Sequence, residues 1–500
     1  MEEIKKMCVL LMRRMLCATL KLAGSACFGI VLLLTGLSAF FFVAGHDVNP
    51  PDVSDLMPLA PPPIEQSENV VPVLMDATNC LVLANSDMTL VNFYRSKNWD
   101  RKIWLDATNC VVLTEQEATT LVDRILVTNA ALFAMLDVAV SRPRAQYPAG
   151  LELNFVIPEL LETSVYSTLW SFESAAFWYG GLVALRARRL RENGRSDLAV
   201  EEMLRYGEMF ARLSYGIESP TCILWLRSPC GPIVGELVDT AVKENLADDM
   251  CVRIDAACVR WAQMRHEAWK KIYFYATWRC RNSLIRDRAL IYDSLYPKKF
   301  FEIMHDLHDC MWAATLAKGM EWAARSFPGY ERYAFQPNRT LAEWASTMRE
   351  TRPLVFALPY TADTRTQLAR IEKSQYNIFH PLRRNCVGSN LLARYNATGF
   401  WRTVGKTAFL DCATRVVIAA ARYRRKYGSL PPTLETLVPE FLAEVPHDPF
   451  DRSRPLGYDL EQGTIHTVGA KGAFHGKIPR YGGLRGDCYP YIRRIDGQAL

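Results

Sequence analysis

An uncharged run near the start of the chain limits how the rest can fold. Residues Leu22–Gly45 read LAGSACFGIVLLLTGLSAFFFVAG and contain no Asp, Glu, Lys or Arg. At about 1.5 Å per residue, a helix of this length crosses the hydrocarbon core of a bilayer, which is roughly 30 Å thick. We therefore expect Leu22–Gly45 to be a transmembrane helix, with the lipid bilayer as its partner.

The charges on either side of this run predict its orientation. Basic residues precede it, at Lys5, Lys6, Arg13, Arg14 and Lys21, and acidic residues follow it, at Asp47, Asp52, Asp55 and Glu65. Basic flanks stay in the cytoplasm. We expect residues 1–21 to be a cytoplasmic basic segment. The body then lies outside the cytoplasm, and the chain is a single-pass protein of the cytoplasmic (inner) membrane.

Three other interpretations of the run are a cleaved signal peptide, a lipoprotein signal and a buried core helix. A signal peptide has an apolar region of roughly 7–15 residues. This run is longer, although Val43-Ala44-Gly45 weakly resembles a cleavage site. The apolar run continues beyond Cys27, which is unlike a lipoprotein signal, and a Pro-rich stretch follows it, which is unlike a core helix. The length favours an uncleaved anchor.

The composition is that of a folded protein with two or three domains. Of the 500 residues, 50% are hydrophobic and 22% are charged, so a large core can be buried. The net charge of +6 is small for this length, whereas nucleic-acid-binding domains concentrate basic charge on one face. No nucleic-acid partner is expected.

Beyond the anchor, a Pro-rich linker at 46–66 leads into a mainly helical body at 67–400. The linker prolines favour extended backbone that holds the body away from the membrane. Periodic apolar residues predict long helices in the body, at Glu115–Ser141, Glu236–Ala268 and Phe300–Phe327.

Two shorter helices of the body form the clearest pair, Leu182–Glu192 and Asp197–Leu213. Asn193-Gly194 is a typical helix stop, and Ser196 is a natural N-cap for the second helix. The pair is similar to a tetratricopeptide-like hairpin, which predicts a body of stacked helical hairpins. The second helix has apolar residues that are expected to be buried, at Leu198, Met203, Leu204, Met209, Phe210 and Leu213.

The last hundred residues, 401–500, combine a helix with a small sheet. The helix is expected at Thr403–Tyr427, with a short helix at Leu434–Leu442. A β-hairpin of Leu456–Leu460 and Thr464–Val468 follows, and the tail reads as irregular. Asp448 before a proline suits an Asx turn. Apolar side chains are expected to pin the loop to the helix, at Leu434, Leu437, Phe441, Leu442 and Phe450.

The segment Ala421–Gly472, ARYRRKYGSLPPTLETLVPEFLAEVPHDPFDRSRPLGYDL…GTIHTVGAKG, resembles the C-terminal module of uncharacterised bacterial membrane-anchored proteins. That module is similar to the globular end of type II secretion pseudopilins. Ser141–Gly150 (SRPRAQYPAG), Arg188–Leu204 and Phe335–Thr340 (FQPNRT) resemble the same group. The resemblance implies a helix held by a loop and a small antiparallel sheet.

The sequence departs from pseudopilins in two respects. Pseudopilin tails are acidic and can bind calcium, but Ala470-Lys471-Gly472 stands where an acidic residue is expected, and only Asp487 and Asp496 are nearby. We expect neither a calcium ion nor any other cofactor. More than three hundred residues separate the anchor from the module, which disfavours a filament subunit.

Cysteine usage does not identify the redox compartment. Eleven cysteines follow the anchor, an odd number, and none forms a CxxC pair. Cys251 and Cys258 lie two helical turns apart, too far to bridge, and are expected to be small buried hydrophobes. Cys222 and Cys230, on either side of a turn, are the best disulfide candidate.

One segment could hold a metal ion. In EIMHDLHDC, Glu302, His305 and Asp309 share a helix face with Asp306. Carboxylates and imidazole can bind a metal or act as acid and base. The spacing matches no established zinc pattern, so these residues are weak candidates, and a polar helix face is the alternative interpretation.

Two further patterns have ordinary structural explanations. Gly399–Thr407 nearly matches a phosphate-binding loop, but five residues separate its glycines instead of four, and no strand precedes it. It is expected to be a loop that leads into a helix. The aromatic stretch Trp261–Trp278 can be a membrane-facing or ligand-stacking surface, although a partly buried helix is favoured.

Taken together, the sequence predicts a mainly α fold: one N-terminal transmembrane helix, a helical-hairpin body and a small α+β pseudopilin-like module. No catalytic residue can be assigned. The leading hypothesis is a membrane-anchored cell-envelope interaction or scaffold protein with an envelope protein partner, and not an enzyme. The alternatives are an envelope metal-dependent hydrolase that uses the His305 region, and an accessory protein of a secretion or pilus-like system.

Overall fold

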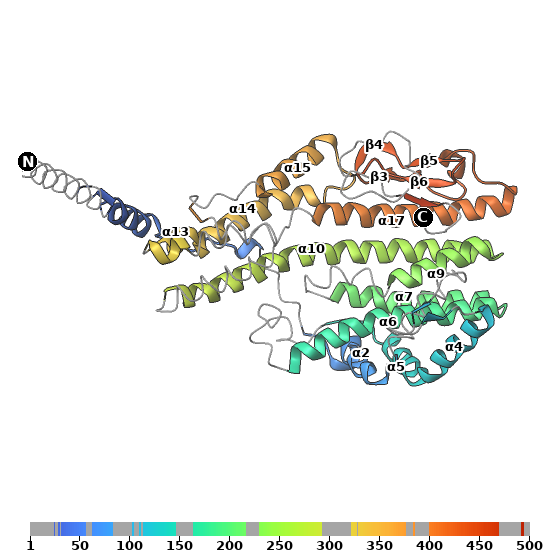
Figure 1. The fold of residues 1–500 in the computed structure, drawn as a ribbon. Coiled ribbons are helices and arrows are strands. Elements are labelled where there is room, and N and C mark those ends of the chain that lie inside the picture. The colour runs from blue at the N-terminus through green and yellow to red at the C-terminus, as the bar shows by residue number, and fades with distance from the viewer. Residues whose placement is uncertain are drawn as a thin grey trace, which may run out of the picture. The chain divides into compact units, whose positions relative to one another are not determined.

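Figure 1 shows the computed structural model of the chain, which is mainly helical with short strands near the C-terminus, as expected. A further short pair of strands, β1 (Ile103–Trp104) and β2 (Cys110–Val111), lies in the part expected to be helical. It describes residues 25, 29–30, 32–56, 63–83, 103–104, 110–111, 114–146, 164–216, 230–292, 322–327, 329–376, 384–385, 400–469 and 492–494. The chain divides into two compact units. Unit 1 comprises residues 1–55, 280–347 and 373–396, and unit 2 comprises residues 56–279, 348–372 and 397–500.

Unit 2 starts with α2 (Val70–Ala77), α4 (Glu115–Thr128) and α5 (Ala130–Val140). The expected helical stretch Glu115–Ser141 is found as two helices, which meet at Asn129. The buried Asn129 amide donates to the Ile125 carbonyl at 2.9 Å and to the Val82 carbonyl at 3.0 Å. Its oxygen accepts from the Val82 N–H at 2.9 Å. These bonds to a distant segment stabilise the break between α4 and α5.

The helical hairpin is confirmed as α6 (Ser164–Glu192) and α7 (Ser196–Gly216), with Gly194 at a φ of 74° between them. Ser196 differs from the expectation: it is the first helical residue of α7, and its hydroxyl bonds Glu244 Oε2 at 3.3 Å. The expected helix Glu236–Ala268 is two helices, α9 (Cys230–Lys243) and α10 (Asp248–Tyr292). The helices α6, α7 and α9 pack on one another around a continuous apolar core.

The C-terminal residues belong to the same unit. The predicted helix is α17 (Phe400–Tyr427), which packs against α9. The predicted pinning of the loop is confirmed for Leu434, Leu437, Phe441 and Leu442, which share a core cluster with Phe409, Ala413, Val416 and Val417. The expected helix Leu434–Leu442 is shorter, a 3-10 turn at Leu434–Leu437 (η6).

Two small antiparallel sheets lie beside α17 (Figure 1). β3 (His447–Asp448) pairs with β4 (Asp451–Pro455). The predicted hairpin is confirmed as β5 (Gly457–Asp459) and β6 (Thr464–His466), with Tyr458 opposite Ile465. The tail was expected to be irregular, but β7 (Ile492–Arg494) pairs with the free edge of β6.

A predicted Asx turn joins these sheets. One carboxylate oxygen of Asp448 accepts the Phe450 N–H at 2.8 Å, and the other accepts the Val468 N–H at 2.7 Å. Asp448 is thereby buried at the junction of the loop and the hairpin. The Phe450 ring is buried against Gly405 of α17, where a side chain of any size would overlap the ring. A glycine at this position lets the loop approach the helix closely.

Unit 1 contains a helix at residues 32–44, α13 (Tyr330–Ala334) and the first part of α14 (Pro337–Val355). Of the expected transmembrane segment, residues 22–24, 26–28 and 31 lie outside the described residues. Leu32, Leu33, Phe40 and Phe42 on this helix are exposed. Among the helices as far as the structure describes them, none is both long and apolar enough to cross a membrane.

Candidate interaction surface

The weak metal candidates Glu302, His305 and Asp309 lie outside the described residues, as does Cys222 of the candidate disulfide. Within the described ranges, no group of three or more His, Cys, Asp and Glu side chains is placed to hold a metal ion. Cys251 and Cys258 are buried in the apolar core of the helices, as expected, and the Cys251 sulfur also accepts a hydrogen bond from Arg425 at 2.8 Å.

The phosphate-loop-like segment is helical from Phe400 onward, so the expected loop before Thr403 is wrong. A phosphate loop needs N–H groups that are free to meet an anion. Gly405 is instead inside α17 against the Phe450 ring. In the aromatic stretch, Trp261 and Trp269 are buried, which agrees with the partly buried helix.

A groove lies along the surface of unit 2 between α7 and α10. It has a volume of about 690 Å³. Its lining is two leucines, three glutamates and three arginines, at Leu198, Leu204, Glu201, Glu202, Glu208, Arg205, Arg253 and Arg260. Leu198 was expected in the buried stripe of α7, but it is 46% exposed and belongs to the groove.

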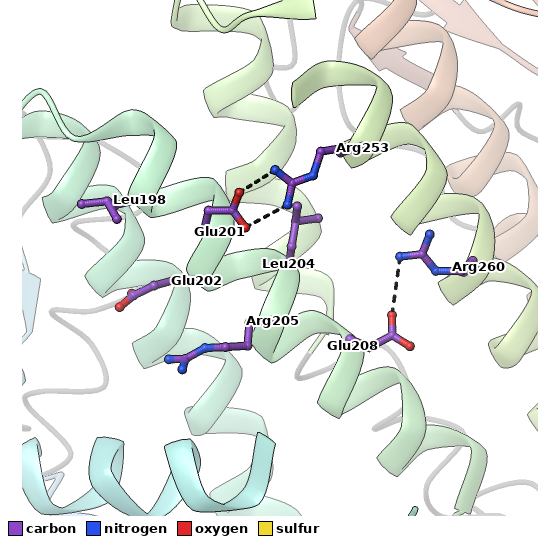
Figure 2. A pocket seen from close by; sticks show the side chains of 8 residues that line it. All are labelled: Leu198, Glu201, Glu202, Leu204, Arg205, Glu208, Arg253 and Arg260. Atoms are coloured by element: carbon purple, nitrogen blue, oxygen red, sulfur yellow. Dashed lines mark hydrogen bonds and ion pairs between the residues drawn. The ribbon is translucent and has the colours of Figure 1, made fainter. Parts of the chain in front are cut away.

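Two ion pairs join α7 to α10 across the groove, Glu201–Arg253 and Glu208–Arg260, and we call each of them a rung (Figure 2). The Arg253 guanidinium bonds both carboxylate oxygens of Glu201, at 2.5 and 2.9 Å. Arg260 lies 3.9 Å from Glu208. Each rung is seven residues from the other on both helices, so the two are separated by about 10.5 Å along the helix axis. The surface therefore carries two pairs of opposite charges, two helical turns apart.

The floor of the groove is fixed by close packing of α7 and α10. The Trp261 ring is buried against Gly207, where no side chain would fit. The indole N–H of Trp261 donates to Glu208 Oε2 at 2.9 Å. This bond connects the second rung to the helical core and holds the Glu208 carboxylate in one orientation.

The remaining charged residues of the lining bond to neighbouring helices. Arg186 of α6 donates to both oxygens of Glu202, at 2.9 and 2.7 Å. Arg205 lies 2.5 Å from Asp137 of α5, and the Tyr206 hydroxyl donates to the same carboxylate at 2.7 Å. Burial raises the pKa of Tyr206 to about 12, so this hydroxyl remains a donor at neutral pH. The network joins α5, α6 and α7 behind the groove.

The lining presents paired acidic and basic side chains beside two leucines. None of the eight lining residues is a Ser, Cys, His or Thr, so the groove offers no hydroxyl, thiol or imidazole nucleophile. The hydrogen bond from Arg253 lowers the pKa of Glu201, which therefore stays ionised at neutral pH and is a poor proton donor. Three acids and three bases also cancel in net charge, which disfavours a polyanionic ligand.

Asp448 is a second candidate, because strongly shifted carboxyl pKa values concentrate at functional sites. Burial raises the pKa of Asp448 to about 6, against the lowering effect of its two backbone hydrogen bonds. Both carboxylate oxygens are already occupied by the Phe450 and Val468 N–H groups. Asp448 therefore holds the loop and hairpin together, and we assign it a structural role.

No known protein family matches the chain. No curated protein and no solved structure shows significant similarity to it. The resemblance to pseudopilin-bearing envelope proteins therefore stays a prediction.

Sequence reasoning missed the groove because it depends on two helices that are far apart in the chain. Glu201, Arg205 and Glu208 follow helical spacing on α7, and Arg253 and Arg260 do so on α10. Each set reads alone as a solvated helix face. Only the pairing of Glu201 with a residue 52 positions away reveals a shared surface.

Proposed function

We propose that the chain is a membrane-anchored cell-envelope interaction protein, which docks a protein partner in the groove between α7 and α10. The observation that carries this proposal is the lining of the groove. The exposed Leu198, the half-buried Leu204 and the two arginine–glutamate rungs form a mixed apolar and charged surface on the two helices. Such surfaces are typical of the rims and cores of protein interfaces.

The spacing of the rungs indicates what kind of segment would fit. Residues seven apart on a helix lie on the same face, two turns from one another. An amphipathic helix laid along the groove can therefore offer charges to both rungs, with an apolar side chain on Leu198 and Leu204. Nucleic acid is a poor fit, because the arginines Arg253 and Arg260 are already paired with carboxylates.

The anchor of this protein is the uncharged run Leu22–Gly45, and we place it in the inner membrane with the body outside the cytoplasm. Two observations support this part of the proposal. The run carries no charge and has basic residues before it. Residues 32–44 are helical, with exposed leucines and phenylalanines that suit a lipid environment.

The proposal is tested by exchanging the charges of one rung. The double variant E201R/R253E keeps an ion pair but reverses its direction. Both side chains are about half exposed, at 48% and 49%, and exposed pairs contribute only about 0.2–1 kcal/mol to stability. The fold should therefore survive. A partner that reads the charges should lose binding, because like charges meet across the interface.

The experiment compares chemical crosslinking of the full chain in its native membranes for wild type, this variant and a matched control. The control is K426E/E440K, which reverses an exposed pair on α17 and its loop, outside the groove. We expect a crosslinked partner, identified by mass spectrometry, that is lost only in E201R/R253E. The docking proposal is wrong if all three proteins give the same crosslinked products at equal yield.

A further inference from the structure

The residues that follow the helix at 32–44 form hydrogen bonds with the start of α14 in unit 1. The Asp47 carboxylate accepts the backbone N–H groups of Asn338 and Arg339, at 2.7 and 3.0 Å. It thus occupies the N-terminal end of α14, where helix N–H groups lack partners and the helix dipole favours a negative charge. The Asn338 amide in turn donates to the Val48 carbonyl at 2.7 Å.

Gln336 provides a second attachment. Its side chain is buried, and its amide donates to the Ala44 carbonyl at 3.1 Å. Its oxygen accepts from the guanidinium groups of Arg339 and Arg384, at 2.8 and 3.1 Å. Arg384 also donates to the His46 carbonyl at 2.5 Å. The first residues of the expected linker are therefore part of a folded junction and not a free spacer.

Aromatic rings complete this junction on the side of the helix. The Phe41 ring contacts the rings of Phe327, Tyr330 and Tyr333, with centroid distances of 5.9, 5.2 and 5.2 Å. Phe41 is buried by these contacts, although its neighbours Phe40 and Phe42 are exposed. The described residues 322–327 and 329–334 thus lie beside the end of the apolar helix (Figure 1).

If the helix at residues 32–44 lies in a membrane, the ring contacts of Phe41 determine how deep Phe327, Tyr330 and Tyr333 lie in the bilayer. Phe41 is four residues before Gly45, the end of the uncharged run, so it lies about 6 Å inside that end. Rings that contact Phe41 must lie at nearly the same depth. Trp322 stacks edge-on against Phe327 at 5.9 Å and is itself 64% exposed. Trp and Tyr concentrate at this level of a bilayer, where an apolar ring and a polar group are both accommodated.

We propose that residues 322–327 and 329–334 form a lipid-binding surface, with Trp322 at its centre, that rests in the outer interface of the membrane beside the anchor. This inference rests on the proposed membrane anchoring of residues 22–45. The ligand is the phospholipid interface, because Trp322 is exposed, as are Phe40 and Phe42 of the helix, and Phe327 contacts Phe41 between them. Unit 1 would then be held against the bilayer by the exposed Trp322 ring, while the buried Tyr330 and Tyr333 rings attach the segment to Phe41 of the anchor.

The test uses the full chain in phosphatidylcholine–phosphatidylglycerol vesicles with a photoreactive residue at one of three exposed positions. The substitution Trp322→p-benzoylphenylalanine probes the proposed surface. The same substitution at Leu33 reports on the anchor, and at Leu460 on a turn of unit 2 outside both; the side chains are 62% and 47% exposed. After illumination, mass spectrometry measures the fraction of protein that carries a lipid adduct.

We expect lipid adducts at positions 322 and 33, several-fold above those at position 460. If position 33 is labelled and position 322 only as weakly as position 460, the lipid-binding surface is refuted while the anchor stands. If position 33 is not labelled either, the anchor itself is refuted, and the surface with it. Trp322 is an exposed residue, so its substitution should leave the fold intact.

Discussion

Replacing Glu236 with alanine should destabilise unit 2 by about 3 kcal/mol, because the change leaves a guanidinium buried without its main partner. Arg191 of α6 donates through Nε and Nη2 to one oxygen of Glu236 of α9, at 3.0 and 2.6 Å. The two side chains are only 5% and 8% exposed. Burial raises the pKa of Glu236, against the lowering effect of Arg191.

The magnitude follows from what remains around Arg191. Breaking a buried ion pair costs about 3–5 kcal/mol. Glu244 lies 3.5 Å from Arg191 and is 33% exposed, so it compensates part of the loss. The cost of Glu236→Ala should therefore fall at the lower end of that range. The double variant Arg191→Met with Glu236→Leu removes both charges and should lie within about 1 kcal/mol of wild type.

The assay is urea unfolding of the full chain in detergent, followed by tryptophan fluorescence and far-ultraviolet circular dichroism. Glu440→Ala is the control, since its partner Lys426 is exposed and the loss should be below about 1 kcal/mol. A cost of Glu236→Ala no larger than that of the control would refute the reasoning. So would a double variant as unstable as the single one.

Two further predictions concern the C-terminal loop. Burial raises the pKa of Asp448 from 3.8 to about 6. As the pH falls, the Asp448 carboxylate is therefore protonated at a higher pH in the folded state than in the unfolded state. As the pH falls from ~7 to ~4, the Asp448 carboxyl should therefore add about 2–2.5 kcal/mol of stability, an effect that Asp448→Asn removes from the measured pH dependence. Gly405→Ala should lower stability by about 1–3 kcal/mol, because the methyl group meets the buried Phe450 ring. The control Gly235→Ala, where α9 leaves open space, should raise it by about 1 kcal/mol in the same unfolding assay.

Structural elements that depend only on residues close together in the chain could be predicted from the sequence. Gly194 ends α6 because a positive φ is available to glycine. The apolar periodicity of the sequence predicted α17. The turn residues Glu461-Gln462-Gly463 and the apolar residues on either side of them predicted the β5–β6 hairpin. The Asx turn at Asp448 likewise depends on neighbouring residues alone.

Features that depend on distant partners could not be predicted in this way. The break at Asn129 is stabilised by Val82, which the sequence does not associate with it. Leu198 fits the apolar period of α7, but it is exposed and lines the groove instead of the core. The groove and the attachment of Asp47 to α14 each join segments whose proximity is decided by tertiary packing.

Whether the groove between α7 and α10 docks a protein is tested most directly by photocrosslinking from inside it. Leu198→p-benzoylphenylalanine places the probe in the groove, and Val127→p-benzoylphenylalanine places it on α4, at a side chain that is 75% exposed and outside the groove. In intact membranes, we predict a discrete protein adduct from position 198 that is absent from position 127 and disappears in the E201R/R253E background. The same adducts from both positions, or an adduct from position 198 that survives the charge exchange, would contradict the docking role of the groove.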